Sequence, residues 1–192
     1  MTTIHTAYIP SLIKAHSRWL ELPVLLTFNM LLVASSYLAI TVPFSPVPIT
    51  GQTFGVLLVA MALGRIRGTA VVLAYLAEGA AGLPVFAGGS AGIGTFVGPT
   101  GGYLVGFAAA AWVVGWLAER GWDRSYLRSI IAMTVGTAII FALGLIQLSL
   151  YLPSAGLAAA GLTPFLPGAA IKISLAAVLL PSIWKMTHRS AE

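Results

Sequence analysis

The chain has 192 residues, of which 58% are hydrophobic and only 8% charged. Because soluble domains contain about 25% charged residues, this composition cannot cover a surface that faces water. A soluble enzyme, a disordered chain and a nucleic-acid-binding protein are therefore excluded. The chain has no cysteine, which excludes disulfides, a thiolate nucleophile and a cysteine-ligated zinc site. The net charge of +5 is modest, and the length fits one membrane-embedded domain, residues 1–192.

Six apolar stretches are candidates for membrane-spanning helices, each of which needs about 20 mostly apolar residues. Residues 1–20 precede the first stretch and are expected to form a cytoplasmic or interfacial segment. The second and third stretches are separated by Gly64–Gly68, which contains Arg65 and Arg67. Because two arginines inside lipid would be costly, a tight turn at the interface is expected there. The six stretches are residues 22–42, 53–64, 68–84, 101–118, 129–150 and 168–184.

The basic residues predict the orientation of these helices. Nine of the ten Lys and Arg residues lie in the N-terminal segment, in the second-to-third and fourth-to-fifth connections, or at the C-terminus. With six helices these positions all fall on one side, which the positive-inside rule makes the cytoplasmic side. Both termini are therefore expected inside. An aromatic belt is expected near the inner boundary, formed by Trp112, Trp116, Trp122 and Trp184.

The first outer connection, residues 43–52, contains no charged residue and is rich in proline. Pro43, Pro46 and Pro48 remove backbone donors and favour a stiff, extended path. A simple linker would carry polar, solvated residues. We therefore expect this apolar segment to fold over the ends of the helices.

The second outer connection, residues 85–100, is also uncharged and is rich in glycine. Glycine lets the backbone approach a ligand closely, and the amides from Thr100 to Gly102 could receive an anionic group at the start of the fourth helix. Alternatively, the glycines only make turns and close helix contacts, as the ladder of Gly98, Gly102 and Gly106 would allow. The third outer connection, residues 151–167, is uncharged as well.

Two charged residues remain inside the predicted spans. Glu78 lies about ten residues into the third and Lys172 a few residues into the sixth, so both map to the outer half of the bilayer. Ionisable residues at such depths are costly and commonly face a cavity or a partner. In one interpretation Lys172 extends to the interface or pairs with Glu78. In the other, either or both line an outward-facing pocket, where Lys172 could hold a carboxylate or a carbonyl oxygen.

Other catalytic patterns are absent from the sequence. The three histidines lie in the terminal segments without an acidic cluster that would complete a metal site. The chain has no Ser-His-Asp spacing and no phosphate-binding Gly-Lys-Ser/Thr motif. We expect neither an enzyme nor a metal or cofactor, and nothing in the sequence could hydrolyse ATP.

Three blocks of sequence carry a family resemblance. Residues 43–53, PFSPVPITGQT, resemble the first-loop signature of BioY, the biotin-specific S-component of energy-coupling factor (ECF) transporters. Residues 82–89, GLPVFAGG, and residues 98–107, GPTGGYLVGF, resemble later blocks of that family. The blocks occur in the family's order and spacing, and the similarity covers about residues 25–185.

The resemblance implies an all-α, S-component-like membrane protein with six helices and a biotin pocket in its outer half. The first and third loops would help to close that pocket. The resemblance also implies that biotin is delivered across a prokaryotic cytoplasmic membrane by docking to a transmembrane coupling subunit that bears two ATPase subunits. The ligand is suited to a mostly neutral pocket, because biotin has an apolar bicyclic body, a ureido group and a carboxylate.

One position departs from the family pattern. The family's sixth helix opens Pro-Gly-Asp-x-x-Lys, whereas this chain has Ala169 in place of the acid and keeps Lys172. We hypothesise that Glu78 supplies the missing polar contact to the ureido group. The predicted ligand-binding residues are Lys172, Glu78, Gln52, Phe86, Thr100, Gly101 and Tyr103, and the candidates for docking to the coupling subunit are Ala34, Ser35 and Ala39.

Several alternatives stay open at this point. The Ala169 departure is compatible with an S-component-like transporter of another small vitamin, and a biotin transporter could also work alone, without a coupling module. A homo-oligomer is possible. A membrane enzyme acting on lipids or isoprenoids is disfavoured, because it would show paired carboxylates or histidine clusters. A channel would need a polar stripe through both halves of the membrane, whereas polarity here stops halfway.

Overall fold

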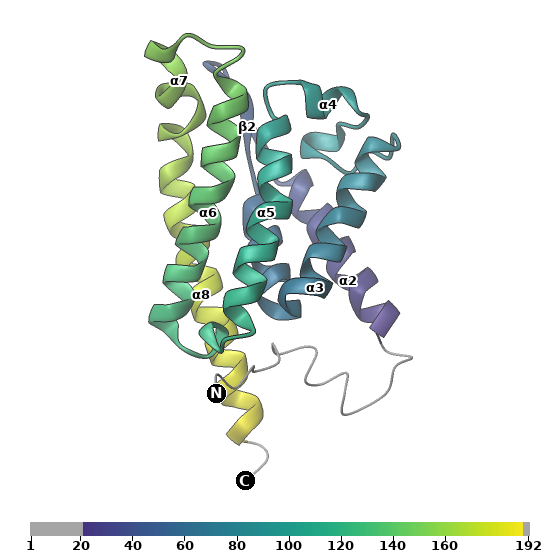
Figure 1. Ribbon diagram of the computed structural model, residues 1–192, viewed down its shortest axis with the longest axis vertical. Helices are drawn as coiled ribbons and strands as arrows, with labels where there is room; N and C mark the ends of the chain where they lie inside the picture. Colours follow the sequence, from purple (N-terminus) through teal and green to yellow (C-terminus); the bar gives the residue numbers. More distant parts are fainter. Residues whose placement is uncertain (1–20, 190–192) are drawn as a thin grey trace.

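The computed structural model describes residues 21–189, with side chains up to Ser182. The predicted N-terminal segment, residues 1–20, and the side chain of Trp184 lie outside the described part. Five long helices form a bundle, while a two-stranded hairpin and two short helices gather at one end (Figure 1). The long helices are α2 (Glu21–Tyr37), α3 (Gln52–Ala80), α5 (Gly101–Ala118), α6 (Tyr126–Leu148) and α8 (Leu166–Arg189). The short helices are α4 (Gly94–Val97) and α7 (Ser154–Gly161).

Four helical segments of the described chain are long and apolar enough to cross a membrane. Three correspond to α3, α5 and α6, and the fourth runs from α7 into α8, residues Ser154–Ser182. Helix α2 is also apolar, and its described part has 17 residues. The predicted membrane protein of mostly helical structure is therefore confirmed, while α7 was not expected from the sequence.

Helix α3 reverses its direction at Gly64. This residue has φ 80° and ψ −175°, a conformation that is open to glycine and costly for other residues. A Cβ atom on Gly68 would lie 2.8 Å from the Cα of Ala60, although eight residues of straight helix span about 12 Å. The two halves of α3 therefore pack against each other, and the tight turn predicted for this arginine-containing segment is present.

The first predicted span, residues 22–42, was too long. Helix α2 ends at Tyr37, and the chain continues as strand β1 (Ala39–Val42), paired antiparallel with β2 (Ser45–Thr50). The sequence Ala-Ile-Thr-Val is as apolar as the helix before it, but its β-branched residues favour a strand. The all-α prediction was wrong at this hairpin, whereas the extended path expected for the prolines of β2 is confirmed.

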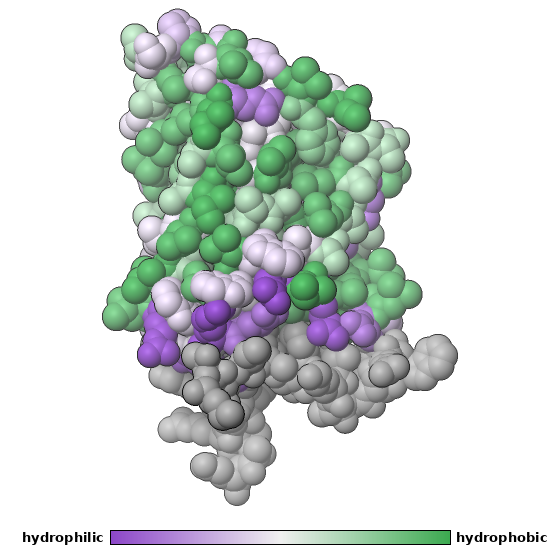
Figure 2. Space-filling model, in the orientation of Figure 1, coloured by the Kyte–Doolittle hydropathy of each residue, from purple (hydrophilic) through white to green (hydrophobic). Residues whose placement is uncertain are grey.

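Charged groups gather at the end of the molecule opposite the hairpin. Figure 2 shows a hydrophilic band there, below flanks that are mostly hydrophobic, and Figure 1 shows that α2 begins, α5 ends and α6 starts at this end. Arg67 pairs with Glu21 at 2.7 Å, joining α3 to α2. Glu119 accepts a hydrogen bond from the backbone amide of Arg65 at 2.9 Å, joining α5 to the turn of α3.

Candidate ligand-binding site

A cavity of about 310 Å³ lies among the helices on the side of the hairpin and α4. This volume is at the lower end of the range of about 300–1,000 Å³ that is typical of small-molecule sites. Its walls come from β2, α3, α5, α6 and α8 and from the glycine-rich segment before α5. The apolar loop that was expected to fold over the helix ends is β2, and it does form part of the wall.

The lining is mostly aromatic and aliphatic, with a few neutral polar groups. Among the described residues that line the cavity, only Lys172 is charged. Such a lining suits a small ligand with a large apolar body and few polar groups. The aromatic residues that line it are Phe54, Phe86, Tyr103, Phe107, Phe141 and Phe165.

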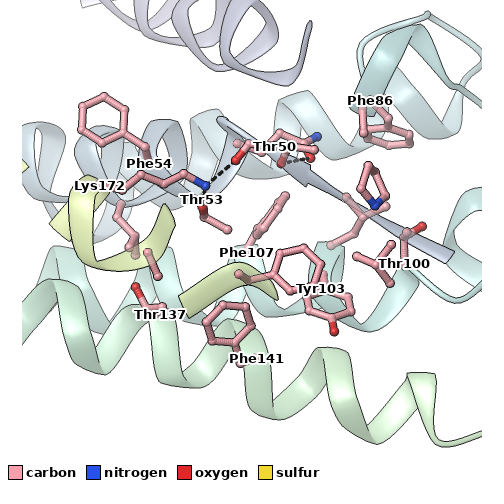
Figure 3. A pocket seen from close by; sticks show the side chains of 18 of the residues that line it. Thr50, Thr53, Phe54, Phe86, Thr100, Tyr103, Phe107, Thr137, Phe141 and Lys172 are labelled. Carbon is pink, nitrogen blue, oxygen red and sulfur yellow. Dashed lines mark hydrogen bonds between the residues drawn. The ribbon is translucent and has the colours of Figure 1, made fainter. Parts of the chain in front are cut away.

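Lys172 projects from α8 toward the start of α3. Its Nζ donates hydrogen bonds to the backbone oxygen of Thr50 and to the Thr53 Oγ1, the latter at 3.0 Å (Figure 3). Neither partner is a carboxylate, and the ion pairs formed within the described part of the chain do not involve Lys172. The cavity therefore holds a cation without a protein anion beside it, which favours a ligand with a negative group.

Glu78 is not among the residues that line this cavity, so the structure does not place it beside Lys172, as the hypothesis of a ligand contact would require. The Glu78 Oε1 accepts a hydrogen bond from the Asn29 Nδ2 at 3.1 Å, so its side chain bridges α3 and α2. Asn29 is buried. Ala169 does line the cavity. The missing family acid is therefore replaced by an apolar surface and not by Glu78.

Four other predicted residues do line the cavity, namely Gln52, Phe86, Thr100 and Tyr103. The amide of Gln52 is already engaged, because its nitrogen donates to the Tyr75 hydroxyl and its oxygen accepts from the Thr50 Oγ1. Tyr103 presents its ring to the cavity while its hydroxyl donates to the backbone oxygen of Gly161, in α7, at 2.8 Å. These two residues therefore shape the wall more than they offer free polar groups.

Gly101 does not line the cavity, so for this residue the alternative of close packing holds. A Cβ atom on Gly101 would overlap the carbonyl oxygen of Phe96. Its backbone amide donates to the oxygen of Gly98 at 3.1 Å. This amide is therefore not available to an anionic ligand at the start of α5.

Thr137 is a cavity residue that the sequence reasoning missed. It lies on α6, is 8% exposed and lines the cavity. Its hydroxyl makes no hydrogen bond within the described part of the chain, whereas Thr134 on the same helix donates to the oxygen of Ile130 at 2.8 Å. In Figure 3, Lys172, Thr53 and Thr137 lie toward one end of the cavity and Thr100 toward the other.

The three residues predicted to dock a coupling subunit differ in accessibility. Ala34 is exposed on α2. Ser35 is buried, and its hydroxyl donates to the oxygen of Leu32 at 2.6 Å. Ala39 is half-buried in β1, where it pairs with Thr50. Ser35 is therefore excluded as a surface contact, and Ala39 is not on the helix where the prediction placed it.

Comparison with known proteins identifies the family. The sequence profile of the BioY family matches residues 13–189. The chain belongs to the BioY family. It is 39% identical over 160 residues to the biotin transporter BioY of Thermotoga maritima, a match that covers 83% of this chain and 92% of that protein. It is also 39% identical over 170 residues to the biotin transporter BioY of Rhodobacter capsulatus, covering 81% and 88% of the two chains.

The fold leads to the same conclusion. A crystal structure of the S-component for biotin from an ECF-type ABC transporter superposes with a TM-score of 0.76 at 28% identity. The match covers 86% of this chain and 90% of that one. The resemblance to the BioY family drawn from the three sequence blocks is thereby confirmed.

Proposed function

We propose that this chain is a biotin-binding transport protein, which takes biotin into the cavity from outside and releases it on the cytoplasmic side. The observation that carries this proposal is the cavity itself, which has an aromatic lining and holds Lys172, a lysine that makes no ion pair with any described residue. The chain is a transporter component and not an enzyme.

The ligand fits the cavity in a defined direction. The biotin carboxylate meets Lys172 and receives a further hydrogen bond from the Thr137 hydroxyl. The bicyclic body lies against the rings of Tyr103, Phe107 and Phe141, and the ureido group reaches toward Thr100. The other predicted contacts, Gln52 and Phe86, shape the wall around the ligand.

The chain is proposed to form one membrane domain with six spans. The turn at Gly64 divides α3 into two of these spans, and α2, α5, α6 and α8 supply the others. The hydrophilic band with Arg65, Arg67 and Glu119 faces the cytoplasm, and the uncharged hairpin, α4 and α7 face outward. Both termini are then cytoplasmic, in a prokaryotic cytoplasmic membrane.

The proposed partners are a transmembrane coupling subunit and two ABC-type ATPase subunits, which supply the energy for release. The exposed face of α2 around Ala34 is the part of the predicted docking surface that remains available. Solitary transport without a coupling module is the second candidate, and a homo-oligomer is a separate candidate assembly. Biotin uptake by cells that contain this chain but no coupling subunit or ATPase would favour solitary transport.

Biotin retention by the purified protein tests the proposed function. We expect the protein to retain biotin after gel filtration and to retain neither thiamine nor riboflavin. The cavity explains this selectivity, because thiamine is a cation and would be repelled by Lys172, and riboflavin has no carboxylate. Retention of another vitamin in place of biotin, or of none, would contradict the proposal.

A further inference from the structure

Two side chains at the outer end of α6 hold the short helix α4. The Gln147 Nε2 donates hydrogen bonds to the backbone oxygens of Phe96 at 2.7 Å and Gly98 at 2.8 Å. The Tyr151 hydroxyl, just after α6, donates to the backbone oxygen of Val97. All three acceptors are carbonyl oxygens. The two bonds from Gln147 therefore come from its amide nitrogen, which has two N–H donors. The last two carbonyls of α4 and the carbonyl of Gly98, which follows it, are therefore bound by Gln147 and Tyr151.

Helix α4 depends on these bonds because it is too short to be stable alone. It has four residues, and isolated helices shorter than about 12 residues are marginal in water. The last carbonyls of any helix also have no partner inside that helix. In α4 the last two carbonyls are those of Phe96 and Val97, which accept hydrogen bonds from Gln147 and Tyr151. These two side chains therefore supply partners that the helix itself lacks.

Gln147 reaches α4 by crossing the first turn of α5, where two glycines lie in succession. A Cβ atom on Gly101 would lie 2.5 Å from the Gln147 Nε2, and one on Gly102 would lie 2.7 Å from the Gln147 Cβ. A side chain at either position would overlap Gln147, and also the carbonyl oxygen of Phe96 (from Gly101) or of Leu143 (from Gly102). The paired glycines at the start of α5 thus leave room for this side chain.

The segment that α6 holds forms one wall of the cavity. Ser90, Thr95 and Thr100 line the cavity from this segment. On the N-terminal side of α4, Gly88 has φ 63° and Gly92 has φ 91°, a backbone region that favours glycine. The wall is joined to α3 by a glycine-rich connection, in which the Gly92 amide donates to the Gly79 oxygen at 2.7 Å. Its other end is held by the bonds from Gln147 and Tyr151 to the end of α4.

We propose that Gln147 and Tyr151 are positioning residues whose hydrogen bonds to α4 keep this wall closed and set the rates at which the ligand enters and leaves. Neither side chain lines the cavity, so both act through α4 and not by touching the ligand. When these bonds break, α4 moves away and the cavity opens to the outer solution. The identity of the ligand rests on the proposed function, whereas the holding of α4 does not.

The first test measures labelling of a single cysteine and needs no ligand. The chain has no native cysteine, so an introduced one is the only thiol. Ala176 lines the cavity and is 1% exposed, so Ala176→Cys reports when a thiol reagent reaches the cavity. Ala111 is equally buried but does not line the cavity, so Ala111→Cys reports general loosening of the bundle.

Gln147→Met keeps the length of the side chain and removes its donors. We expect Gln147→Met to speed labelling of Ala176→Cys by about tenfold, the effect of losing hydrogen bonds of this kind, and to leave Ala111→Cys unchanged.

Two further variants serve as comparisons. Tyr151→Phe removes one donor and should speed labelling of the cavity reporter in the same direction but by a smaller factor. Ser149→Ala removes a hydroxyl just after α6 that donates to the oxygen of Ile146, and should change neither reporter. Equal labelling of Ala176→Cys with and without Gln147→Met, or faster labelling of both reporters, would overturn the proposal.

The second test measures biotin binding rates. In Gln147→Met we expect the association and dissociation rates to rise by similar factors, so that the Kd changes less than either rate. A rise in the dissociation rate alone would mean that this wall does not control entry of the ligand, and would overturn the proposal that Gln147 sets both rates. A protein that retains no biotin would contradict the proposed function and leave the labelling result standing.

Discussion

Lys172 and Thr137 reach the cavity from different helices, and only Lys172 could be recognised in the sequence. A lysine inside an apolar span stands out because its charge is costly to bury. A threonine does not, because its hydroxyl commonly bonds to the carbonyl one turn back, as Thr134 does with Ile130. Which threonine departs from this pattern depends on the surrounding helices, so it becomes apparent only in the folded chain.

Thr137→Val tests the hydroxyl as a ligand contact. Valine keeps the shape of the side chain and removes the donor, so the loss of one net hydrogen bond of about 1 kcal/mol should weaken biotin binding about fivefold. Thr134→Val on the exposed face of α6 is the matched control and should leave the Kd unchanged. The measurement is the Kd of the purified variants. Equal affinity for Thr137→Val and the parent would remove this contact.

For Glu78, the sequence predicts the depth in the membrane but not the side of the helix on which the residue lies. Counting residues from the helix ends gives the depth, and Glu78 does lie inside α3. The direction cannot be read in the same way, because a helix that is apolar on all sides has no polar face to indicate what it contacts. The contact of Glu78 with Asn29 of α2 therefore could not be foreseen.

Glu78→Gln should have little effect on the ligand. Glutamine keeps an oxygen that can accept from Asn29, and the side chain does not line the cavity. We expect the Kd for biotin to change by no more than about twofold, as for substitutions outside a site. A large loss of affinity, measured alongside Lys172→Met, would return Glu78 to the binding site.

At the scale of elements, most helices were predictable and the turns between them only in part. Long apolar runs bounded by charges or by glycine and proline marked α5, α6 and α8 closely. The hairpin was missed because Ala39–Val42 continues the apolar run of α2 without a break in composition. The bonds from Gln147 to α4 join residues about 50 positions apart, and no local pattern in the sequence encodes such a contact.

The reversal of α3 depends on one glycine. Gly64→Ala places a side chain in a backbone region that costs about 1–3 kcal/mol for residues other than glycine. We expect the midpoint of thermal unfolding in detergent to fall by several degrees. Gly156→Ala in α7, where an added Cβ meets nothing within 4 Å, is the control and should not lower the midpoint. If both variants unfold at the parent temperature, α3 does not turn through the conformation described for Gly64.

At the scale of the whole molecule, the two ends differ in charge, and this difference was already present in the spacing of the basic residues. The folded chain places Arg65, Arg67 and Glu119 together at one end through ion pairs and hydrogen bonds. The cavity lies toward the other end, beside β2 and α4. In the proposed orientation, the ligand enters at the uncharged end, and its release at the charged end requires a further conformational change.

Labelling of single cysteines tests this orientation. Ser154 is exposed at the start of α7, and Arg128 is exposed near the start of α6 at the opposite end. In intact cells, a thiol reagent that cannot cross the membrane should label Ser154→Cys and should label Arg128→Cys only after the cells are lysed. Labelling of Arg128→Cys in intact cells would reverse the proposed orientation.

The proposed pairing of Lys172 with the biotin carboxylate is tested most directly by combining one variant with one ligand analogue. Biotin and biotin methyl ester are each bound to the parent protein and to Lys172→Met. The parent should bind biotin about 10- to 100-fold more tightly than the ester, because a hydrogen bond to a charged group contributes about 1.5–3 kcal/mol, and Lys172→Met should bind both ligands equally weakly. If Lys172→Met still prefers biotin over the ester by the parent's factor, Lys172 does not hold the carboxylate.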